Sequence, residues 1–263
     1  MSVAHLTKSV LAALALCGAA LTAHAGPTLW LSTGSNQLAT VDVATGATTV
    51  VGSTGVFLTD IAFDPTGNLY GISFSALYSV NKTNGSTTLI GSLGSFSGVA
   101  NALVFAADGT LYMAGNTLYT VNVGTGASTA LGSGIGFQSA GDLAFIGGEL
   151  YMAASNNHLV KVDTGTGVGS DIGDIGIGST FGLASADNIT LYGMAGQTVF
   201  TINTTTGAGS GQVTFSPLLG GFAAGSAFLS EAGAQVPEPG SLALVGAALL
   251  AASAIRRHAA RRA

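Results

Sequence analysis

The sequence predicts an all-β fold, a β-propeller of five four-stranded blades that is closed by its N- and C-terminal strands. A turn motif recurs along the chain, and its final glycines lie 39, 41, 41 and 40 residues apart. No helical pattern lies inside this repeat, so each unit has the length and character of four short strands. The copies of the motif occupy residues 41–46, 80–85, 121–126, 162–167 and 202–207.

The turn motif has a structural explanation in every copy. Its second residue is Asp or Asn, as in Asp42 and Asn122, and its last residue is glycine. An Asx side chain can accept a hydrogen bond from the backbone two residues further on, and glycine supplies the positive φ that closes a hairpin loop. We therefore interpret these motifs as turns between strands and not as binding sites.

A second repeated element precedes each turn. It is a leucine followed by an aromatic residue, and in three units a phenylalanine lies further upstream, at Phe63, Phe105 and Phe145. Alternating apolar residues of this kind are typical of strands that are covered on both sides, as between neighbouring blades. The leucine–aromatic pairs are Leu29-Trp30, Leu69-Tyr70, Leu111-Tyr112, Leu150-Tyr151 and Leu191-Tyr192.

The two ends of the repeat region indicate how the ring closes. The first unit begins directly at Leu29 and lacks a preceding strand, whereas residues 221–228 offer a spare strand after the last turn. Closure by this strand would remove the exposed sheet edges. Six blades with one degenerate blade is the alternative. The predicted blades are 57–92, 97–133, 137–174, 178–214, and a composite of 28–52 with 219–229.

The blade pattern of residues 118–132 is similar to the repeat of quinoprotein-like and related bacterial secreted propellers. That resemblance covers most of the region 26–232, which we take as one propeller domain. Propellers with such blades include dehydrogenases, lactonases and plain scaffolds, so the fold alone does not define an activity.

The composition limits the classes of molecule that the domain could bind. Between residues 26 and 235, Lys82 and Lys161 stand against nine Asp together with Glu149 and Glu231, a net charge of 2 − 11 = −9. Such a domain cannot neutralise phosphates, which argues against a nucleic-acid partner. The only cysteine, Cys17, lies in the N-terminal segment.

The N-terminal segment resembles a secretory signal peptide. An apolar run follows Lys8, and the small residues Ala23 and Ala25 lie where signal peptidase needs them. We expect residues 1–25 to be removed by cleavage between Ala25 and Gly26. Cys17 would leave with them, so the mature chain would have no thiol.

The strongest candidate for a ligand site is the set Asp60, Asn101 and Asp142, each a few residues before its blade's phenylalanine. Their oxygens could converge near the central channel and bind Ca²⁺, as lactonase-type propellers do with carboxylate and amide ligands. The alternative, which we favour, is that they accept hydrogen bonds from backbone N–H groups. Gly182 and Gly221 stand at the places that we take as equivalent in the other blades.

Other catalytic signals are weak, so the sequence predicts a protein that is not an enzyme. His158 is the only histidine left after processing, and we expect it in an exposed turn. No Gly-x-Ser-x-Gly elbow is present. A quinone cofactor would need basic residues, and Lys82 and Lys161 fall near outer hairpins. No cofactor is therefore expected, with Ca²⁺ as the one candidate ion.

The C-terminal segment 233–263 combines three features in order. Val236, Pro237, Glu238 and Pro239 form an extended motif, and an apolar stretch predicts a transmembrane helix over about 241–255. The basic cluster places the C-terminus in the cytoplasm by the positive-inside rule. The cluster consists of Arg256, Arg257, Arg261 and Arg262.

This arrangement resembles the PEP-CTERM sorting signal of exported proteins of Gram-negative bacteria. The resemblance implies transient anchoring in the inner membrane, recognition by an exosortase and processing near Glu238. Release to the cell surface or the extracellular matrix would follow. A permanent single-span anchor is the alternative, but it leaves the Pro-Glu-Pro motif unexplained.

Together these features predict a surface or matrix protein whose propeller is a scaffold or a module that binds a glycan or another ligand. An exopolysaccharide is a candidate partner, beside the exosortase and signal peptidase. The alternative function is a propeller hydrolase or dehydrogenase with a Ca²⁺ or cofactor site at the channel mouth.

Overall fold

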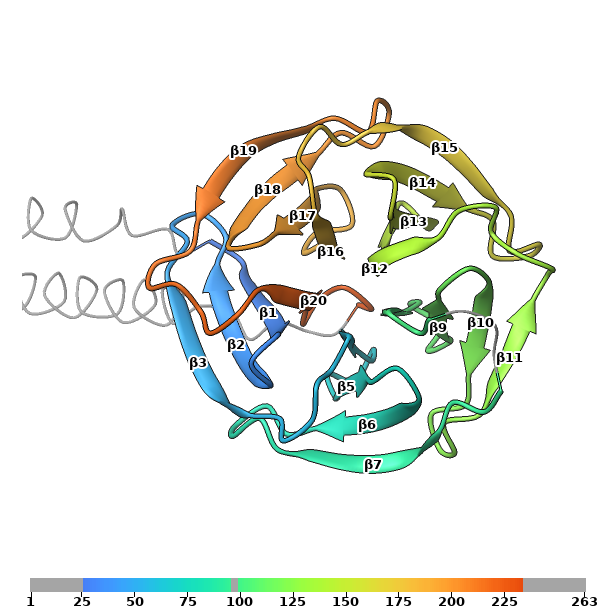
Figure 1. The fold of residues 1–263 in the computed structure, drawn as a ribbon, viewed down its shortest axis with the longest axis horizontal. Helices are drawn as coiled ribbons and strands as arrows, with labels where there is room; N and C mark the ends of the chain where they lie inside the picture. The colour runs from blue at the N-terminus through green and yellow to red at the C-terminus, as the bar shows by residue number, and fades with distance from the viewer. Residues whose placement is uncertain (1–25, 96–98, 234–263) are drawn as a thin grey trace, which may run out of the picture.

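The computed structural model describes residues 26–95 and 99–233. Within these residues, twenty strands form five antiparallel four-stranded sheets arranged as a ring around one axis (Figure 1). The five-bladed propeller predicted from the repeat is therefore confirmed. We number the blades 1 to 5, starting from the blade that contains β1.

Each blade has four strands, which follow one another from the axis outward. Blade 1 contains β20 (Ala223–Phe228), β1 (Thr28–Thr33), β2 (Gln37–Asp42) and β3 (Thr48–Ser53). Blade 2 contains β4 (Asp60–Phe63), β5 (Leu69–Ile72), β6 (Ala76–Val80) and β7 (Thr87–Ser92). Blade 3 contains β8 (Ala102–Phe105), β9 (Leu111–Ala114), β10 (Leu118–Val121) and β11 (Ser128–Leu131). Blade 4 contains β12 (Ser139–Ile146), β13 (Glu149–Ala154), β14 (His158–Val162) and β15 (Gly169–Asp174). Blade 5 contains β16 (Thr180–Ala184), β17 (Leu191–Ala195), β18 (Thr198–Ile202) and β19 (Gly209–Thr214).

The ring closes inside blade 1, as the sequence predicts. Strand β20 pairs antiparallel with β1, with Leu29 opposite Phe228. One blade is thus built from both ends of the domain, which leaves no inner strand without a partner.

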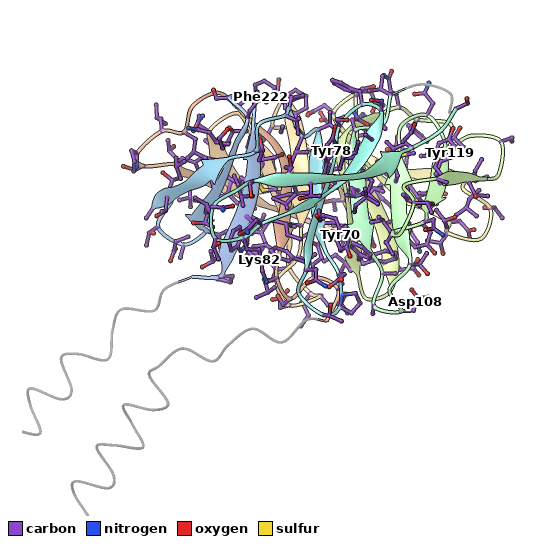
Figure 2. The ribbon with its side chains drawn as sticks, turned by 90° about the horizontal axis from the view of Figure 1, so that it is seen from below. Tyr70, Tyr78, Lys82, Asp108, Tyr119 and Phe222 are labelled. Carbon is purple, nitrogen blue, oxygen red and sulfur yellow. The ribbon has the colours of Figure 1, made fainter. Side chains whose placement is uncertain are left out.

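This closure also places the two ends of the described domain on one side of the ring. Because β1 and β20 are antiparallel, the chain enters β1 and leaves β20 at the same face. We call this the proximal face and the opposite one, where the inner strands begin, the distal face. Figure 2 shows Phe222 at the distal face, with Lys82 and Asp108 at the proximal face.

The turn motifs have the predicted geometry. The Asp42 carboxylate accepts a hydrogen bond from Ala44 N at 2.9 Å, and Gly46 has a φ of +74°. The same bond forms in the other four motifs, which begin their turns at Asn81, Asn122, Asp163 and Asn203.

Aromatic pairs connect neighbouring blades near the proximal face. The Trp30 ring of blade 1 packs edge-on against Phe63 of blade 2, with 5.7 Å between centroids. Blade 5 has Ser185 where the other inner strands have phenylalanine. The remaining pairs are Tyr70 with Phe105, Tyr112 with Phe145, and Tyr192 with Phe228. These contacts stack the blades as the repeated aromatic positions predict.

Several predictions from the sequence fall outside the described residues. They are the signal peptide 1–25 with Ala25, the motif Val236, Pro237, Glu238 and Pro239, the helix over about 241–255, and Arg256, Arg257, Arg261 and Arg262. Among residues 26–95 and 99–233, no helix is long and apolar enough to cross a membrane.

Candidate functional site

Asp60 and Asp142 occupy the same level of two inner strands. Each lies three residues before the phenylalanine of its strand, and Asp60 lies opposite Ile72, the fourth residue of β5. The equivalent residues in the other inner strands are Ala102, Gly182 and Gly225. The assignment of Gly221 to this level is therefore wrong, because that residue lies in the loop before β20.

The small residues at this level leave room for the two carboxyl groups. A Cβ atom on Gly225 would lie 2.2 Å from Asp60 Oδ1, which no side chain could tolerate. Asp60 and Asp142 are both fully buried. The axis of the propeller is thus filled by side chains at this level, and neither carboxyl group lines an open channel.

Backbone N–H groups satisfy both carboxylates. Asp60 accepts bonds from Ile61 N at 2.7 Å and from Leu103 N in blade 3 at 2.5 Å. Asp142 likewise accepts a bond from Leu183 N in blade 5 at 2.9 Å. Each carboxylate therefore links its own inner strand to that of the next blade.

Ser226 of β20 connects the two aspartates. Its hydroxyl donates to Asp142 Oδ2 at 2.7 Å, and its backbone N lies 3.2 Å from Asp142 Oδ2 and 3.3 Å from Asp60 Oδ1. The strand that closes the ring is therefore held by the two aspartates of blades 2 and 4.

Burial has a strong effect on the protonation of these groups. It raises the pKa of Asp142 to about 8. Burial, and then the charge of Asp142 and a hydrogen bond with it, raise the pKa of Asp60 well above its usual value. The pKa of Glu231, whose carboxylate accepts bonds from Ser185 N and Phe228 N, is raised by burial and by Asp142. The cluster therefore holds protons at a pH where exposed carboxyls have lost them.

Asn101 does not join the aspartates. It lies one residue before Ala102, so strand alternation directs its side chain elsewhere, and its amide donates to Ser139 O at 3.1 Å. A calcium ion needs six to eight oxygen ligands with free lone pairs, whereas N–H donors already surround both carboxylates. Within the described residues, no group of three or more His, Cys, Asp or Glu side chains could hold a metal ion. This donor set fits backbone capping better than Ca²⁺ binding, and the calcium site stays a prediction.

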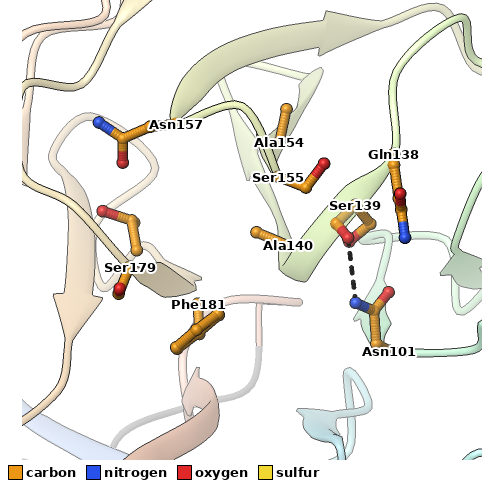
Figure 3. Close-up of a pocket in the computed structure, with 10 residues that line it drawn as sticks. Asn101, Gln138, Ser139, Ala140, Ala154, Ser155, Asn157, Ser179 and Phe181 are labelled. Carbon is orange, nitrogen blue, oxygen red and sulfur yellow. Dashed lines mark hydrogen bonds between the residues drawn. The ribbon is translucent and has the colours of Figure 1, made fainter.

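A pocket of about 380 Å³ opens on the distal face between blades 4 and 5 (Figure 3). We call it the amide pocket, since Asn101, Gln138 and Asn157 lie around it with several hydroxyl groups. None of the residues that line it is charged. They are Asn101, Gln138, Ser139, Ala140, Ala154, Ser155, Asn157, Ser179, Thr180 and Phe181.

Three polar atoms of the amide pocket are buried without a hydrogen-bond partner among the described residues: Asn101 Oδ1, Ser139 Oγ and Asn157 Oδ1. Ser139 is only 2% exposed. A buried polar group that makes no hydrogen bond costs about 1–3 kcal/mol, so such atoms need water or a ligand. The residues that line the pocket therefore include three polar groups that lack a hydrogen bond.

A row of phenylalanines lies beside the amide pocket on the same face, and we call it the aromatic row. It contains Phe74, Phe57, Phe222 and Phe181, and successive ring centroids lie 6.0, 6.4 and 5.9 Å apart. Phe74 is 53% exposed and Phe222 is 46% exposed. Phe181 also lines the pocket, so the row and the pocket form one continuous site.

His158 lies apart from this site. It begins β14 rather than lying in a turn, and its Nδ1 lies 2.8 Å from an oxygen of Asp171. Asp171 and Asp174 belong to β15. None of the three lines the amide pocket.

Sequence reasoning missed the pocket and the row because their residues come from loops and strand ends that do not repeat. One signal was available. Phe57, Phe74, Phe181 and Phe222 all fall outside the repeated apolar positions that build the blades.

Comparison with protein families identified the C-terminal segment. Residues 235–258 match the family described as the PEP-CTERM protein-sorting motif, and this segment contains the Pro-Glu-Pro triplet. The resemblance of the tail to the PEP-CTERM sorting signal is thus confirmed. The chain carries a C-terminal signal for export sorting, which implies processing by an exosortase-type membrane enzyme. No curated protein matches the chain.

Solved structures resemble the propeller in fold alone. A chain of the nidogen/laminin complex has a TM-score of 0.54 at 12% identity, over 76% of this chain and 97% of that chain. A symmetrical protein studied for its de novo evolutionary emergence has a TM-score of 0.51 at 18% identity, over 75% and 94%. The calcium-binding protein regucalcin from Agrobacterium tumefaciens has a TM-score of 0.48 at 20% identity, over 73% and 71%.

Proposed function

We propose that this chain is an exported, non-catalytic binding module that reaches the cell surface or extracellular matrix through its C-terminal signal. Its ligand site is the amide pocket together with the aromatic row. The observation that carries the proposal is the cluster of unpaired buried polar atoms at Asn101, Ser139 and Asn157, which lies next to exposed aromatic rings.

The position of the chain ends supports this function. The sorting tail follows Gly233, which leaves the domain at the proximal face, as does Gly26. The amide pocket and the aromatic row lie on the distal face. While the tail is held in the membrane, the attachment point is therefore on the side of the ring opposite to the ligand site.

The chemistry of the site favours binding over catalysis. None of the residues that line the amide pocket titrates near neutral pH, so no general base lies beside the Ser139 hydroxyl. The buried carboxyls of Asp60 and Asp142 are fully enclosed, where a substrate could not reach them. A propeller hydrolase or dehydrogenase would need such a group within reach of its substrate.

The sorting step can be tested by intact-mass analysis of the protein from membrane, surface and medium fractions of its native host. We expect a chain that starts at Gly26 and ends near Pro237 in the surface or medium fraction. Glu238→Ala should keep the tail and stay in the membrane, while Ile189→Ala, an exposed position of the propeller outside the matched segment, should be processed normally. The tail would be a permanent anchor if the wild-type chain at the surface retained residues 240–263 and if Glu238→Ala retained the same residues in the same fraction.

Catalysis is tested separately on lactones, sugar derivatives and alcohols. We expect no turnover above that of Ser139→Ala. Turnover by the wild type that both Ser139→Ala and Asn101→Ala abolish would instead support an enzyme at the amide pocket.

A further inference from the structure

We propose that the distal face binds a neutral polysaccharide chain. The aromatic row would lie under the apolar faces of its sugar rings, and the amide pocket would hydrogen-bond its hydroxyl groups. This inference rests on the proposed function, because it names the ligand class of the same site.

The aromatic row is built for a flat, partly apolar partner. Its rings come from separate segments, namely the loops before β4 and β20, the turn after β5 and the start of β16. Packing of each ring on the next fixes their positions, and Phe74 and Phe222 still expose about half of their surface. A sugar ring has one face of C–H groups that can cover an aromatic ring, and its hydroxyls point to the sides.

The unpaired atoms of the amide pocket match those hydroxyls. Asn101 Oδ1 and Asn157 Oδ1 are acceptors, and their amide nitrogens are already engaged with Ser139 O and Asp174 Oδ1. The Ser139 hydroxyl can both donate and accept. Each hydroxyl of a ligand is both donor and acceptor, so it can pair with these side chains once small rotations turn their buried atoms into the pocket.

Charge selects a neutral chain over a polyuronate or a sulfated one. No charged residue lines the amide pocket, and the aromatic row is entirely phenylalanine. The lysines of the described domain lie elsewhere: Lys82 at the proximal face, and Lys161 in an ion pair with Glu149 at 2.9 Å. An anionic polymer would therefore meet no counter-charge at the site and would be repelled by the acidic domain.

The length of the site favours a chain over a single sugar. Gln138 lines the amide pocket and also a neighbouring pocket of about 290 Å³ that contains Asn116 and Phe137. Phe181 lines the other side of the amide pocket and continues into the aromatic row. The polar and aromatic surface thus runs around the distal face from blade 3 through blades 4, 5 and 1 to blade 2.

A peptide ligand fits this surface less well. Addition of a peptide strand requires an exposed strand edge, whereas the distal face presents strand ends and loops. A bound amphipathic helix requires an apolar groove, whereas amide and hydroxyl groups line the pocket.

The inference can be tested by native affinity electrophoresis of the full-length chain in mild detergent. The gels contain a neutral glucan, a neutral galactomannan or, as the anionic polymer, alginate. We expect at least one neutral polymer to retard the protein and alginate not to do so. Phe74→Ala combined with Phe222→Ala should weaken binding about thirtyfold, since the two aromatic contacts are worth about 1 kcal/mol each and tenfold in affinity corresponds to about 1.4 kcal/mol. Gln138→Ala should also weaken it.

Ile189→Ala is the matched control, because this side chain is 79% exposed in the turn between β16 and β17 at the proximal face. It should bind as the wild type does. Absence of retardation by either neutral polymer, or retardation that the Phe74 and Phe222 substitutions leave unchanged, would overturn the inference. A ligand of another class whose binding those substitutions abolish would keep the proposed binding face and reject the polysaccharide. The remaining outcome is self-association in the absence of polysaccharide. If Phe222→Ala abolished that self-association, the polysaccharide would also be rejected, since a second copy of the chain would then cover the row.

Discussion

The ring of Phe181 packs against the ring of Phe222 with 5.9 Å between centroids, and this contact joins the amide pocket to the aromatic row. Phe181 belongs to the inner strand of blade 5, and Phe222 directly precedes the strand that closes blade 1. The two halves of the candidate site therefore meet where the ring itself is closed. Correct pairing of β20 with β1 is therefore expected to affect both the stability of the domain and ligand binding.

Stability should depend on pH through the buried carboxyl cluster. The pKa of Asp142 is raised to about 8 in the folded state, against about 3.9 in the unfolded chain. The folded state thus keeps a proton that the unfolded state loses, so the contribution of Asp142 to stability is largest below about pH 4 and is lost as the pH rises to about 8. Asp60 and Glu231 act in the same direction. We expect the Tm to fall steadily from pH 5 to pH 8 and Asp142→Asn to flatten that slope. An unchanged slope in this variant would contradict the assignment.

Gly225→Ala should destabilise the domain strongly. Its new Cβ would lie 2.2 Å from Asp60 Oδ1 and 2.4 Å from Asp60 Cα, so the inner strands would have to move apart. Overpacking of this kind costs about 3 kcal/mol, which lowers the Tm by roughly 6–12 °C in a domain of this size. Gly178→Ala is the matched control, since nothing lies within 4 Å of its new Cβ, and it should melt like the wild type. Equal melting temperatures for both variants would mean that the axis is not packed as described.

Removal of the closing strand should cause aggregation. Deletion of residues 221–230 takes away β20, the partner of β1, and also Ser226, which bonds to Asp142. Unpaired strand edges then become available to other chains. Light scattering should show aggregates of this variant at concentrations where the wild type stays dispersed. A soluble deletion variant that melts cooperatively would refute the importance of this closure.

Calcium should not stabilise the domain. The carboxylates of Asp60 and Asp142 are already bonded to backbone N–H groups, and Asn101 points elsewhere. We expect millimolar Ca²⁺ to shift the Tm by less than about 1 °C, because an ion that binds only the folded state would raise it. A larger rise that Asp60→Asn and Asn101→Ala both abolish would establish the calcium site instead.

The sequence was sufficient for the architecture because the blades repeat. The turn motif from Asp42 to Gly46 and the pairing of Trp30 with Phe63 are local consequences of periodic positions. The missing inner strand of the first unit and the spare strand near Phe228 together define the closure.

The site was harder to predict because it depends on register and on loops. Asn101 is four residues before Phe105, whereas Asp60 is three before Phe63, and one residue of offset turns a strand side chain to the other face. The aromatic row combines Phe57, Phe74 and Phe222 from segments without a shared pattern. Only the folded ring brings them together.

Our central claim is that the distal face binds the ligand of the sorted protein after processing. The most direct test is the fraction of processed chain that stays with the cell surface and matrix when wild type is compared with the combined Phe74→Ala and Phe222→Ala variant. We expect equal intact masses for both, retention of the wild type, and release of the variant into the medium, with Ile189→Ala retained like the wild type. Equal retention of the variant and the wild type would contradict the claim.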